Sequence, residues 1–229
     1  MQEEILTGGR STVGVVKIGN EVRRPHKNES DFANNFLQFL EKQNYPFSQR
    51  YLGRDEQGRD RFLFINGTVP KDIEKTNLVQ LCDFMKMVRQ FHDISLDFTN
   101  SKKVVCHNDL SPCNTVFQNN RPVGIIDWDS AAPGERWEDL TYILWLWINI
   151  GSHRRSEINI LGQMKTALSA YNADKKTLAN FADKLIWRME KVISQMSPQN
   201  FQYERTKNWV EFSKLWVQEN RIKLIGEIG

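Results

Sequence analysis

The chain has 229 residues, which is enough for one large domain or two small ones and for a full hydrophobic core. Its formal net charge at pH 7 is only +3, with acids and bases interspersed, so we expect no nucleic-acid partner. The three cysteines lack metal-ligand spacing and the N-terminus has no apolar signal core, so we expect a cytoplasmic protein. No apolar run is long enough to cross a bilayer, and no membrane association is expected.

The first 69 residues predict a small unit that is rich in strands. Residues 31–42 carry apolar side chains at helical spacing, and Ser30 is placed to cap this helix. Short apolar runs separated by glycine, proline or charged turns predict the strands around it. In chain order, the predicted elements are a glycine-rich turn at 7–12, strands at 13–18 and 22–24, the helix at 31–42, a hairpin of strands at 51–53 and 61–65, and a hinge at 65–72.

Beyond the hinge the sequence predicts mainly helices. Apolar residues recur at helical spacing, and the tryptophan-rich run at 140–150 is expected to lie in the core of this half. A strand-rich unit followed by a helical one indicates the α+β class. The predicted elements are helices at 72–94, 156–171, 175–194 and 202–224, and strands at 104–106, 115–117 and 123–126.

Two segments of the second half carry polar residues suited to chemistry. Residues 107–114 have the spacing His-x-Asp-x-x-x-x-Asn, and Asp127 directly follows the apolar strand at 123–126. The predicted hairpin brings Asp127 back to the end where the 107–114 loop lies. Phosphoryl transfer needs an oriented acceptor hydroxyl and Mg²⁺ clamped across the phosphates. We therefore interpret Asp109 as a base that receives the hydroxyl proton, and Asn114 and Asp127 as Mg²⁺ ligands.

Each of these residues by itself also has an ordinary structural explanation. His107 is expected to be a buried, hydrogen-bonded loop residue even in an enzyme. Asp109 and Asn114 are both suited to turns. Asp127 is harder to explain in this way, because an acid at the end of an apolar strand is costly to bury unless it is paired or bound to a cation. The order and spacing of the whole set favour the functional interpretation.

The stretch Val105–Trp147 resembles the core of the aminoglycoside phosphotransferase family, which includes choline-kinase-like and other small-molecule kinases related to protein kinases. The resemblance implies that Asp109 is the catalytic base. It also implies that Asn114 and Asp127 bind the metal. Asp129 stands where the family often has a second acid or a glycine, and is a weaker candidate for the metal.

The resemblance further implies a fold and two supporting residues. Asp139 matches an acid that braces the catalytic loop in kinase-like folds, and His107 is expected to support the same loop. The implied fold is α+β, bilobal and protein-kinase-like. A nucleotide-binding lobe at 1–69 would be a small antiparallel sheet with one helix, and a catalytic and acceptor-binding lobe at 70–229 would be larger and mainly helical.

The predicted small lobe is expected to bind ATP or GTP. Backbone amides of the glycine-rich turn, around Gly9, are suited to cradling phosphates together with the Ser11 and Thr12 hydroxyls. The same turn has the composition of an ordinary surface turn. Ile65, at the predicted hinge, is a further candidate for contact with the nucleotide.

The small lobe departs from the family pattern on its third strand. Most kinase-like proteins carry a phosphate-binding lysine there, whereas this chain has Arg23 and Arg24. Strand alternation turns only one of the two toward the cleft. An arginine binds phosphate well, often through two hydrogen bonds, but with a geometry different from that of lysine. The helix position that normally supplies the glutamate partner holds Asn34 or Asn35.

Together these features predict an ATP-dependent kinase that phosphorylates a hydroxyl of a small molecule, as a monomer or a homodimer. The acceptor stays open among aminoglycosides, macrolides, choline-like amines, sugars and amino alcohols, so antibiotic resistance is one candidate role. Acids on the C-terminal helices are candidate contacts for a cationic acceptor, although exposed helix acids are commonly only solvated: Glu157, Asp174, Asp183 and Glu190.

Two other classes of protein remain as alternatives. A kinase-like binding module without catalysis is suggested by the missing lysine–glutamate pair, although the catalytic and metal positions are all kept. A metal-dependent hydrolase that uses His107, Asp109, Asp127 and Asp129 fits the acids but leaves the small lobe unexplained.

Overall fold

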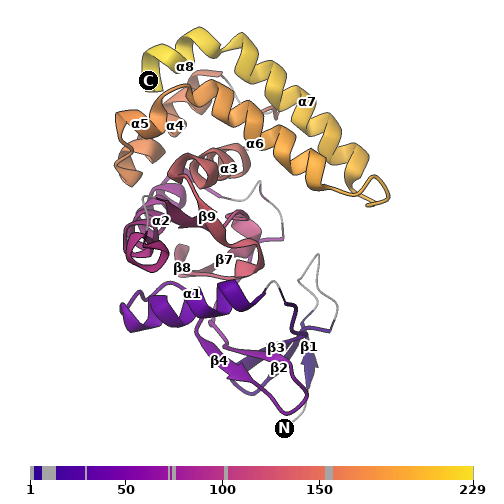
Figure 1. The fold of residues 1–229 in the computed structure, drawn as a ribbon. Coiled ribbons are helices and arrows are strands. Elements are labelled where there is room, and N and C mark those ends of the chain that lie inside the picture. Colours follow the sequence, from indigo (N-terminus) through magenta and orange to yellow (C-terminus); the bar gives the residue numbers. More distant parts are fainter. Residues whose placement is uncertain are drawn as a thin grey trace.

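The N-terminal part of the structure is an antiparallel sheet with one helix beside it (Figure 1). The computed structural model describes residues 3–6, 14–28, 30–71, 73, 76–100, 103–152 and 157–228. Within these residues the sheet has five strands, in the order β1-β2-β3-β5-β4. They are β1 (Glu4–Ile5), β2 (Val16–Ile18), β3 (Glu21–Arg24), β4 (Tyr51–Arg54) and β5 (Asp60–Leu63). Gly14 has a φ of +87°, so β2 begins later than the predicted residue 13.

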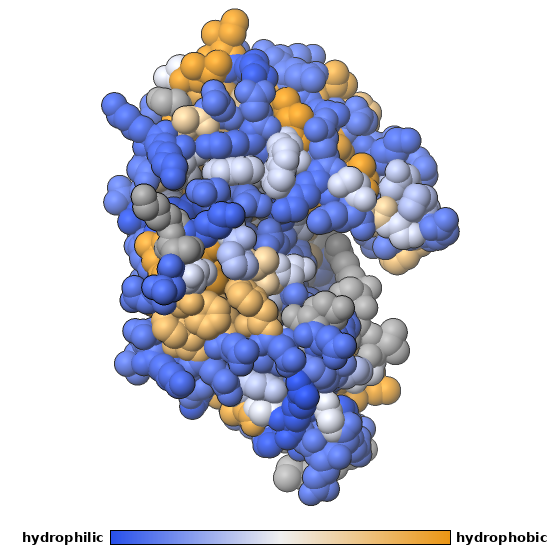
Figure 2. Space-filling model, viewed as in Figure 1, coloured by the Kyte–Doolittle hydropathy of each residue, from blue (hydrophilic) through white to orange (hydrophobic). Residues whose placement is uncertain are grey.

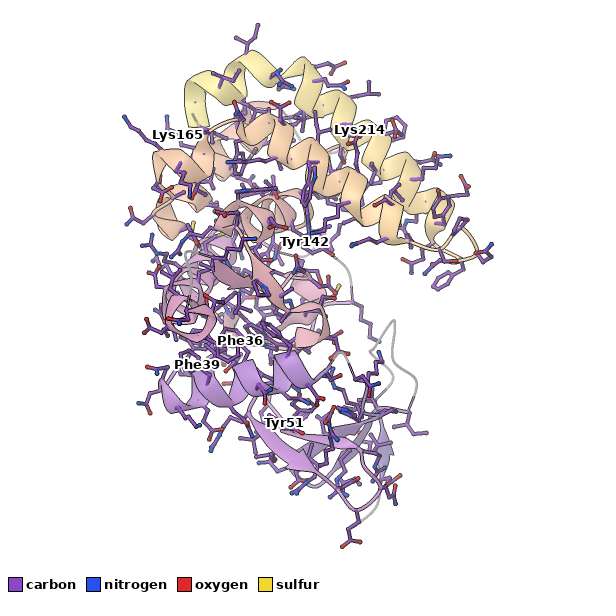
Figure 3. All side chains as sticks on the ribbon, viewed as in Figure 1. Phe36, Phe39, Tyr51, Tyr142, Lys165 and Lys214 are labelled. Carbon is purple, nitrogen blue, oxygen red and sulfur yellow. The ribbon has the colours of Figure 1, made fainter. Side chains whose placement is uncertain are left out.

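Helix α1 (Ser30–Lys42) lies between this sheet and the helical part of the chain. Phe36 and Phe39 are on the side of α1 that faces the helical part (Figure 3), where the Phe36 ring packs against Phe98 and Trp128. Aromatic pairs of this kind add to the burial of apolar area. The small sheet is therefore fixed to the larger part through α1. Ser30, expected as the cap, is already the first helical residue.

The linker from β5 to the helical part is tied to the next hairpin through its backbone. The N–H of Thr68 donates to the carbonyl of Phe117 at 2.9 Å, and the N–H of Phe117 donates back at 2.8 Å. Gly67 has a φ of +146°, and a Cβ atom there would lie 2.5 Å from Val116 Cγ1. Only glycine fits this approach, because it lacks the Cβ atom.

The C-terminal part is mainly helical, with two small antiparallel strand pairs in its centre. β6 pairs with β9 and β7 pairs with β8. Two short 3-10 turns, 112–114 and 128–130, follow the loop after β6 and the end of β8. The elements are α2 (Leu78–Thr99), β6 (Val104–Cys106), β7 (Thr115–Gln118), β8 (Arg121–Ile125), β9 (Ala132–Gly134), α3 (Arg136–Ile148), α4 (Glu157–Tyr171), α5 (Lys175–Leu178), α6 (Phe181–Gln195), α7 (Tyr203–Glu219) and α8 (Arg221–Ile228).

Three of the predicted helices begin or break at a different residue in the structure, and an asparagine lies at each of these points. The helix expected at 72–94 runs from Leu78 to Thr99, and it begins there because Asn77 forms a capping box with Gln80. The helix expected at 175–194 is divided into α5 and α6 at Asn180, whose φ is +55°. The helix expected at 202–224 is divided into α7 and α8 at Asn220. Asparagine tolerates non-helical backbone better than most residues.

The apolar run in α3 forms the centre of the larger part, as predicted. Trp145 and Trp147 are buried, and each indole N–H has a partner. Trp145 Nε1 donates to Ser213 Oγ at 2.9 Å, and Trp147 Nε1 donates to the carbonyl of Leu110 at 3.0 Å. These bonds remove the cost of burying the indole nitrogens. Among the described helices, none combines the length and apolarity needed to span a bilayer.

Glycine positions give a direct test of the packing. Gly162 lies within α4, and a Cβ atom there would meet nothing within 4 Å. We expect Gly162→Ala to stabilise the protein by about 0.5–1 kcal/mol, because alanine loses less backbone entropy in a helix. Gly67→Ala should destabilise it by more than about 1 kcal/mol. Urea unfolding of both variants checks these values, and a stable Gly67→Ala protein would contradict the linker geometry.

Candidate active site

The loop after β6 is held in place by one buried carboxylate. Asp139, in the first turn of α3, accepts the backbone N–H of His107 at Oδ2 and that of Asn108 at Oδ1, both at 2.8 Å. His92 Nε2 lies 3.1 Å from the same Oδ2. Burial raises the pKa of Asp139, but the hydrogen bonds from His92 and His107 outweigh it and leave the pKa below its usual value. An ionised acid therefore braces the loop.

His92 is enclosed together with this carboxylate. Its Nδ1 lies 2.7 Å from the Tyr171 hydroxyl, so both ring nitrogens are engaged. Burial lowers the pKa of His92 despite the nearby Asp139. The Cys106 thiol lies close by, and burial raises its pKa well above the usual value. Because the imidazole has no free nitrogen and the thiol keeps its proton, this cluster fits a structural role better than a metal site.

His107 connects the loop to the chain just before Asp127. Its Nδ1 accepts the backbone N–H of Asp109 at 3.2 Å, and its Nε2 therefore carries the proton and donates to the carbonyl of Ile126 at 3.1 Å. The side chain is buried and stays within the protein. These contacts hold the loop to residue 126, and the supporting role of His107 stays a prediction.

Asp109 lies in the loop with a hydrogen bond to each carboxylate oxygen. Oδ1 accepts the Tyr142 hydroxyl at 2.7 Å, and Oδ2 accepts Asn114 Nδ2 at 2.8 Å. Burial, and then the charge of Asp109, raise the pKa of Tyr142 well above its usual value, so the phenol remains the donor. The guanidinium of Arg188 lies over the Tyr142 ring at 4.6 Å and donates to Asn108. Figure 3 shows Tyr142 beneath α6.

The sequence did not single out Tyr142 or Arg188. Tyr142 follows Asp139 by three residues, so both lie on the same face of α3. That spacing is the signal that could have indicated Tyr142, because Asp139 is expected to face the loop. Arg188 lies on α6, far along the chain, and no local pattern marked it.

The β7–β8 hairpin places Asn114 beside Asp127. Thr115 pairs with Ile125, and the N–H of Ile126 donates to the carbonyl of Asn114 at 3.0 Å. The amide nitrogen of Asn114 also donates to the backbone carbonyl of Asp109 at 2.9 Å, which leaves its amide oxygen for another partner. Asp127 has a φ of +64°, a bend that begins the 3-10 turn at 128–130. The oxygens of Asn114 and Asp127 are of the kind that Mg²⁺ prefers.

Arg24 is the arginine that reaches these acids. Its Nη1 lies 3.4 Å from Asp127 Oδ1, and its Nη2 forms an ion pair with Asp129. Arg23, on the opposite face of β3, pairs instead with Glu21 and Asp55. Side chains alternate along a strand, so the two arginines cannot share a face.

Asn34 of α1 does not contact Arg24. It is buried and donates through Nδ2 to Asp60 Oδ1 at 3.2 Å. Asp60 also accepts the Tyr51 hydroxyl at 3.1 Å and lies 3.0 Å from His26 Nδ1. Asn34, one of the two residues expected at the glutamate position, is therefore part of a separate polar cluster, and Asn35, the other, is exposed.

The other predicted nucleotide contacts are only partly described. Ile65 packs against β8, since a Cβ atom on Gly124 would lie 2.7 Å from Ile65 Cδ1. Gly9, Ser11 and Thr12 lie outside the residues that the structure describes.

Three of the acids proposed for a cationic acceptor have other partners. Asp174 caps α5 by accepting the N–H of Thr177 at 2.7 Å. Asp183 pairs with Arg221, and Glu190 pairs with Lys214 at 2.9 Å. The side chain of Glu157 lies outside the description.

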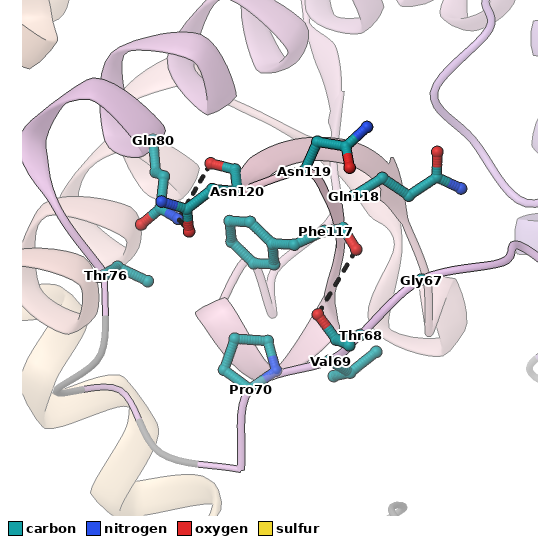
Figure 4. Close-up of a pocket in the computed structure, with 10 residues that line it drawn as sticks. All are labelled: Gly67, Thr68, Val69, Pro70, Thr76, Gln80, Phe117, Gln118, Asn119 and Asn120. Carbon is teal, nitrogen blue, oxygen red and sulfur yellow. Dashed lines mark hydrogen bonds between the residues drawn. The ribbon is translucent and has the colours of Figure 1, made fainter.

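A separate cavity of about 510 Å³ lies behind the linker (Figure 4). It is lined by the linker residues 67–70 and by the turn between β7 and β8. Gln80 Nε2 donates there to Asn120 Oδ1 at 3.0 Å. Asp109 and Asp127 lie at the opposite end of the same hairpin, so this cavity is not the site of the proposed chemistry. Figure 2 shows a notch beneath the protruding tip of the α6–α7 pair.

Comparison with known proteins agrees with this arrangement. Residues 71–160 match the model of the phosphotransferase enzyme family. A trifolitoxin immunity protein of Rhizobium leguminosarum bv. trifolii is 28% identical over 214 residues, covering 81% of this chain and 80% of that protein.

Solved structures share the fold at low sequence identity. A microcompartment-associated aminopropanol kinase superposes with a TM-score of 0.69 at 10% identity, covering 97% of this chain and 93% of that one. The ternary complex of streptomycin, ATP and APH(2″)-IIa gives a TM-score of 0.60 at 13% identity, covering 93% of each chain. The predicted family resemblance and the predicted kinase-like α+β fold are confirmed. The match of residues 71–160 and the shared fold both point to a small-molecule phosphotransferase.

Buried His92 predicts a pH dependence of stability. Its pKa is lowered in the folded protein, so unfolding allows the ring to take up a proton once the pH falls below about 6.5. Stability should therefore be complete above that pH and fall as the pH decreases, by up to about 1.4 kcal/mol per pH unit for one proton. Urea unfolding between pH 7.5 and 5 measures this slope. His92→Gln should have a shallower slope than the wild type, and equal slopes would show that His92 is not the group responsible.

Proposed function

We propose that this chain, a small-molecule phosphotransferase by family and fold, moves the γ-phosphoryl group of ATP to a hydroxyl of a small molecule. The observation that carries the proposal is the convergence of Asp109, Asn114 and Asp127 at one end of the β7–β8 hairpin. Asp139 and His107 hold that end in place. Catalysis of phosphoryl transfer depends mainly on such positioning and on charge stabilisation.

Asp109 is proposed to be the base. Tyr142 and Asn114 each donate to one of its oxygens, and together they fix the plane of the carboxylate. An acceptor hydroxyl that approaches Asp109 would transfer its proton to this carboxylate late in the reaction. His107 takes no part in the transfer, because both of its ring nitrogens bind within the loop.

Asn114 and Asp127 are proposed to hold Mg²⁺. They supply one amide oxygen and one carboxylate, and Asp127 is 36% exposed, so it is accessible to a metal bound to phosphates. When bound, Mg²⁺ would neutralise charge on the β- and γ-phosphates. Arg24, which pairs with Asp127, is proposed to contact the same phosphates, and the turn around Gly9, Ser11 and Thr12 is proposed to cover them.

The acceptor is to be found by an ATP-consumption screen across hydroxylated antibiotics and metabolites, with GTP as a second donor. The immunity relative makes hydroxyl-bearing toxins one arm of that screen, and a protective role belongs to the same proposal. A cytoplasmic location, where ATP is abundant, fits an odd number of cysteines without metal-ligand spacing.

Removal of the base should abolish transfer. We expect Asp109→Asn to lower kcat by about 10²- to 10⁴-fold with little change in nucleotide affinity, because the amide cannot accept the proton. Transfer to the acceptor found in the screen, together with thermal unfolding, measures the effect. Asp97→Asn, an exposed acid on α2, is the control. Normal transfer by folded Asp109→Asn would exclude Asp109 as the base.

Removal of the Tyr142 hydroxyl should have a smaller effect. We expect Tyr142→Phe to lower kcat by about tenfold, because a hydrogen bond to a charged group contributes about 1.5–3 kcal/mol. Tyr45→Phe is the matched control, since Tyr45 also loses one buried hydrogen bond, to the carbonyl of Met87 at 3.0 Å. Steady-state kinetics of both variants measures the two losses of kcat. An equal loss of kcat in the two would mean that Tyr142 has only a structural role.

A further inference from the structure

Arg24 joins the two parts of the protein through the acids next to the proposed metal site. It lies at the end of β3, in the small sheet, whereas Asp127 and Asp129 follow β8 in the larger part. Arg24 Nη1 lies 3.4 Å from Asp127 Oδ1, while Nη2 pairs at closer range with Asp129. The ion pair therefore spans residues more than a hundred positions apart.

The surroundings make this pair stronger than an ordinary surface ion pair. The Arg24 side chain is 9% exposed, and its guanidinium lies over the Phe62 ring at 4.7 Å. Lys27 Nζ lies 3.7 Å from Asp129 Oδ2, so both oxygens of Asp129 face cations. Partial burial reduces screening by water, and a guanidinium can hold two acceptors at once because its donors form a rigid fork.

Helix α1 offers no acid to Arg24. Asn34, one of the two residues expected to supply such a partner, donates to Asp60, which also contacts Tyr51 and His26. Among the residues that the structure describes, Arg24 forms ion pairs with Asp127 and Asp129. If Asp127 turns to a metal, Asp129 is the acid that remains.

We propose that Asp129 is a positioning residue that anchors Arg24 for contact with the nucleotide phosphates. The inference rests on the proposed function. The two neighbouring acids then have different roles. Asp127, the more exposed of the two, binds the metal, and Asp129 holds the arginine and is not a metal ligand. This ion pair between the two parts of the protein would take the place of the lysine–glutamate pair that most kinase-like proteins form within the small lobe.

The test measures nucleotide binding, which does not require the acceptor. Calorimetry with Mg²⁺ and a non-hydrolysable ATP analogue is compared for the wild type, Asp129→Asn and Arg24→Lys. We expect each variant to bind the analogue about tenfold more weakly, as follows from loss of one charge-assisted contact. The double variant should bind the analogue about as weakly as either single variant, because both changes disrupt the same contact.

Arg23→Lys is the matched control. It makes the same change on the adjacent residue of β3, where Arg23 pairs with Glu21 and Asp55 on the other face. We expect it to bind the analogue as the wild type does. A loss equal to that of Arg24→Lys would overturn the assignment of Arg24.

The number of bound metal ions distinguishes a residue that anchors Arg24 from a residue that coordinates the metal. In the presence of the analogue, Mn²⁺ binding followed by electron paramagnetic resonance should give the same number of ions for Asp129→Asn and the wild type. Asp127→Asn should bind fewer. Loss of an ion in Asp129→Asn, or unchanged affinity for the analogue, would overturn the anchor role. A wild-type protein that binds no nucleotide would instead refute the proposed function itself, and thermal unfolding confirms that each variant is folded.

Discussion

The rest of the site depends on the hydrogen bonds that the buried carboxylate of Asp139 accepts. This carboxylate accepts the backbone N–H groups of His107 and Asn108 and a hydrogen bond from His92, all within the core. A loop that leaves a buried strand has backbone donors that water cannot reach, and these must find partners. An acid from α3 satisfies two of them at once and fixes where the loop turns. The position of Asp109 follows from that turn.

From this anchor the site extends through short, directed contacts. His107 ties the loop to Ile126, and the β7–β8 hairpin carries Asn114 and Asp127 to the same end. Asn119 and Asn120 both have positive φ at the hairpin turn, as the right-handed twist of a two-residue hairpin requires. Asp109 receives one donor from the loop and one from α3. Asn114 and Tyr142 thus orient the carboxylate of Asp109.

The connection between the two parts of the molecule has an apolar and an ionic component. Phe36 of α1 packs on Phe98 and Trp128, while Arg24 pairs with Asp127 and Asp129. The apolar contact is non-directional and sets the distance between sheet and helices. The ionic contact lies at the mouth of the site, where charged phosphates are proposed to bind. A nucleotide would therefore meet an arginine that is already oriented.

The sequence alone determined the features that depend on local order. The His-x-Asp spacing, the apolar strands and the turn signals between them sufficed to place Asp109, Asn114 and Asp127 together, because a hairpin is a short-range structure. The sequence could not place the breaks at Asn180 and Asn220, since asparagine is compatible with both helix and turn until packing decides. Only the tertiary structure selected Arg24 over Arg23, directed Asn34 to Asp60, and brought Tyr142 and Arg188 to the loop at 107–114. These contacts join segments far apart in the chain, and the physical reason is that side-chain pairing across such distances follows from how the elements pack and leaves no periodic signal in sequence.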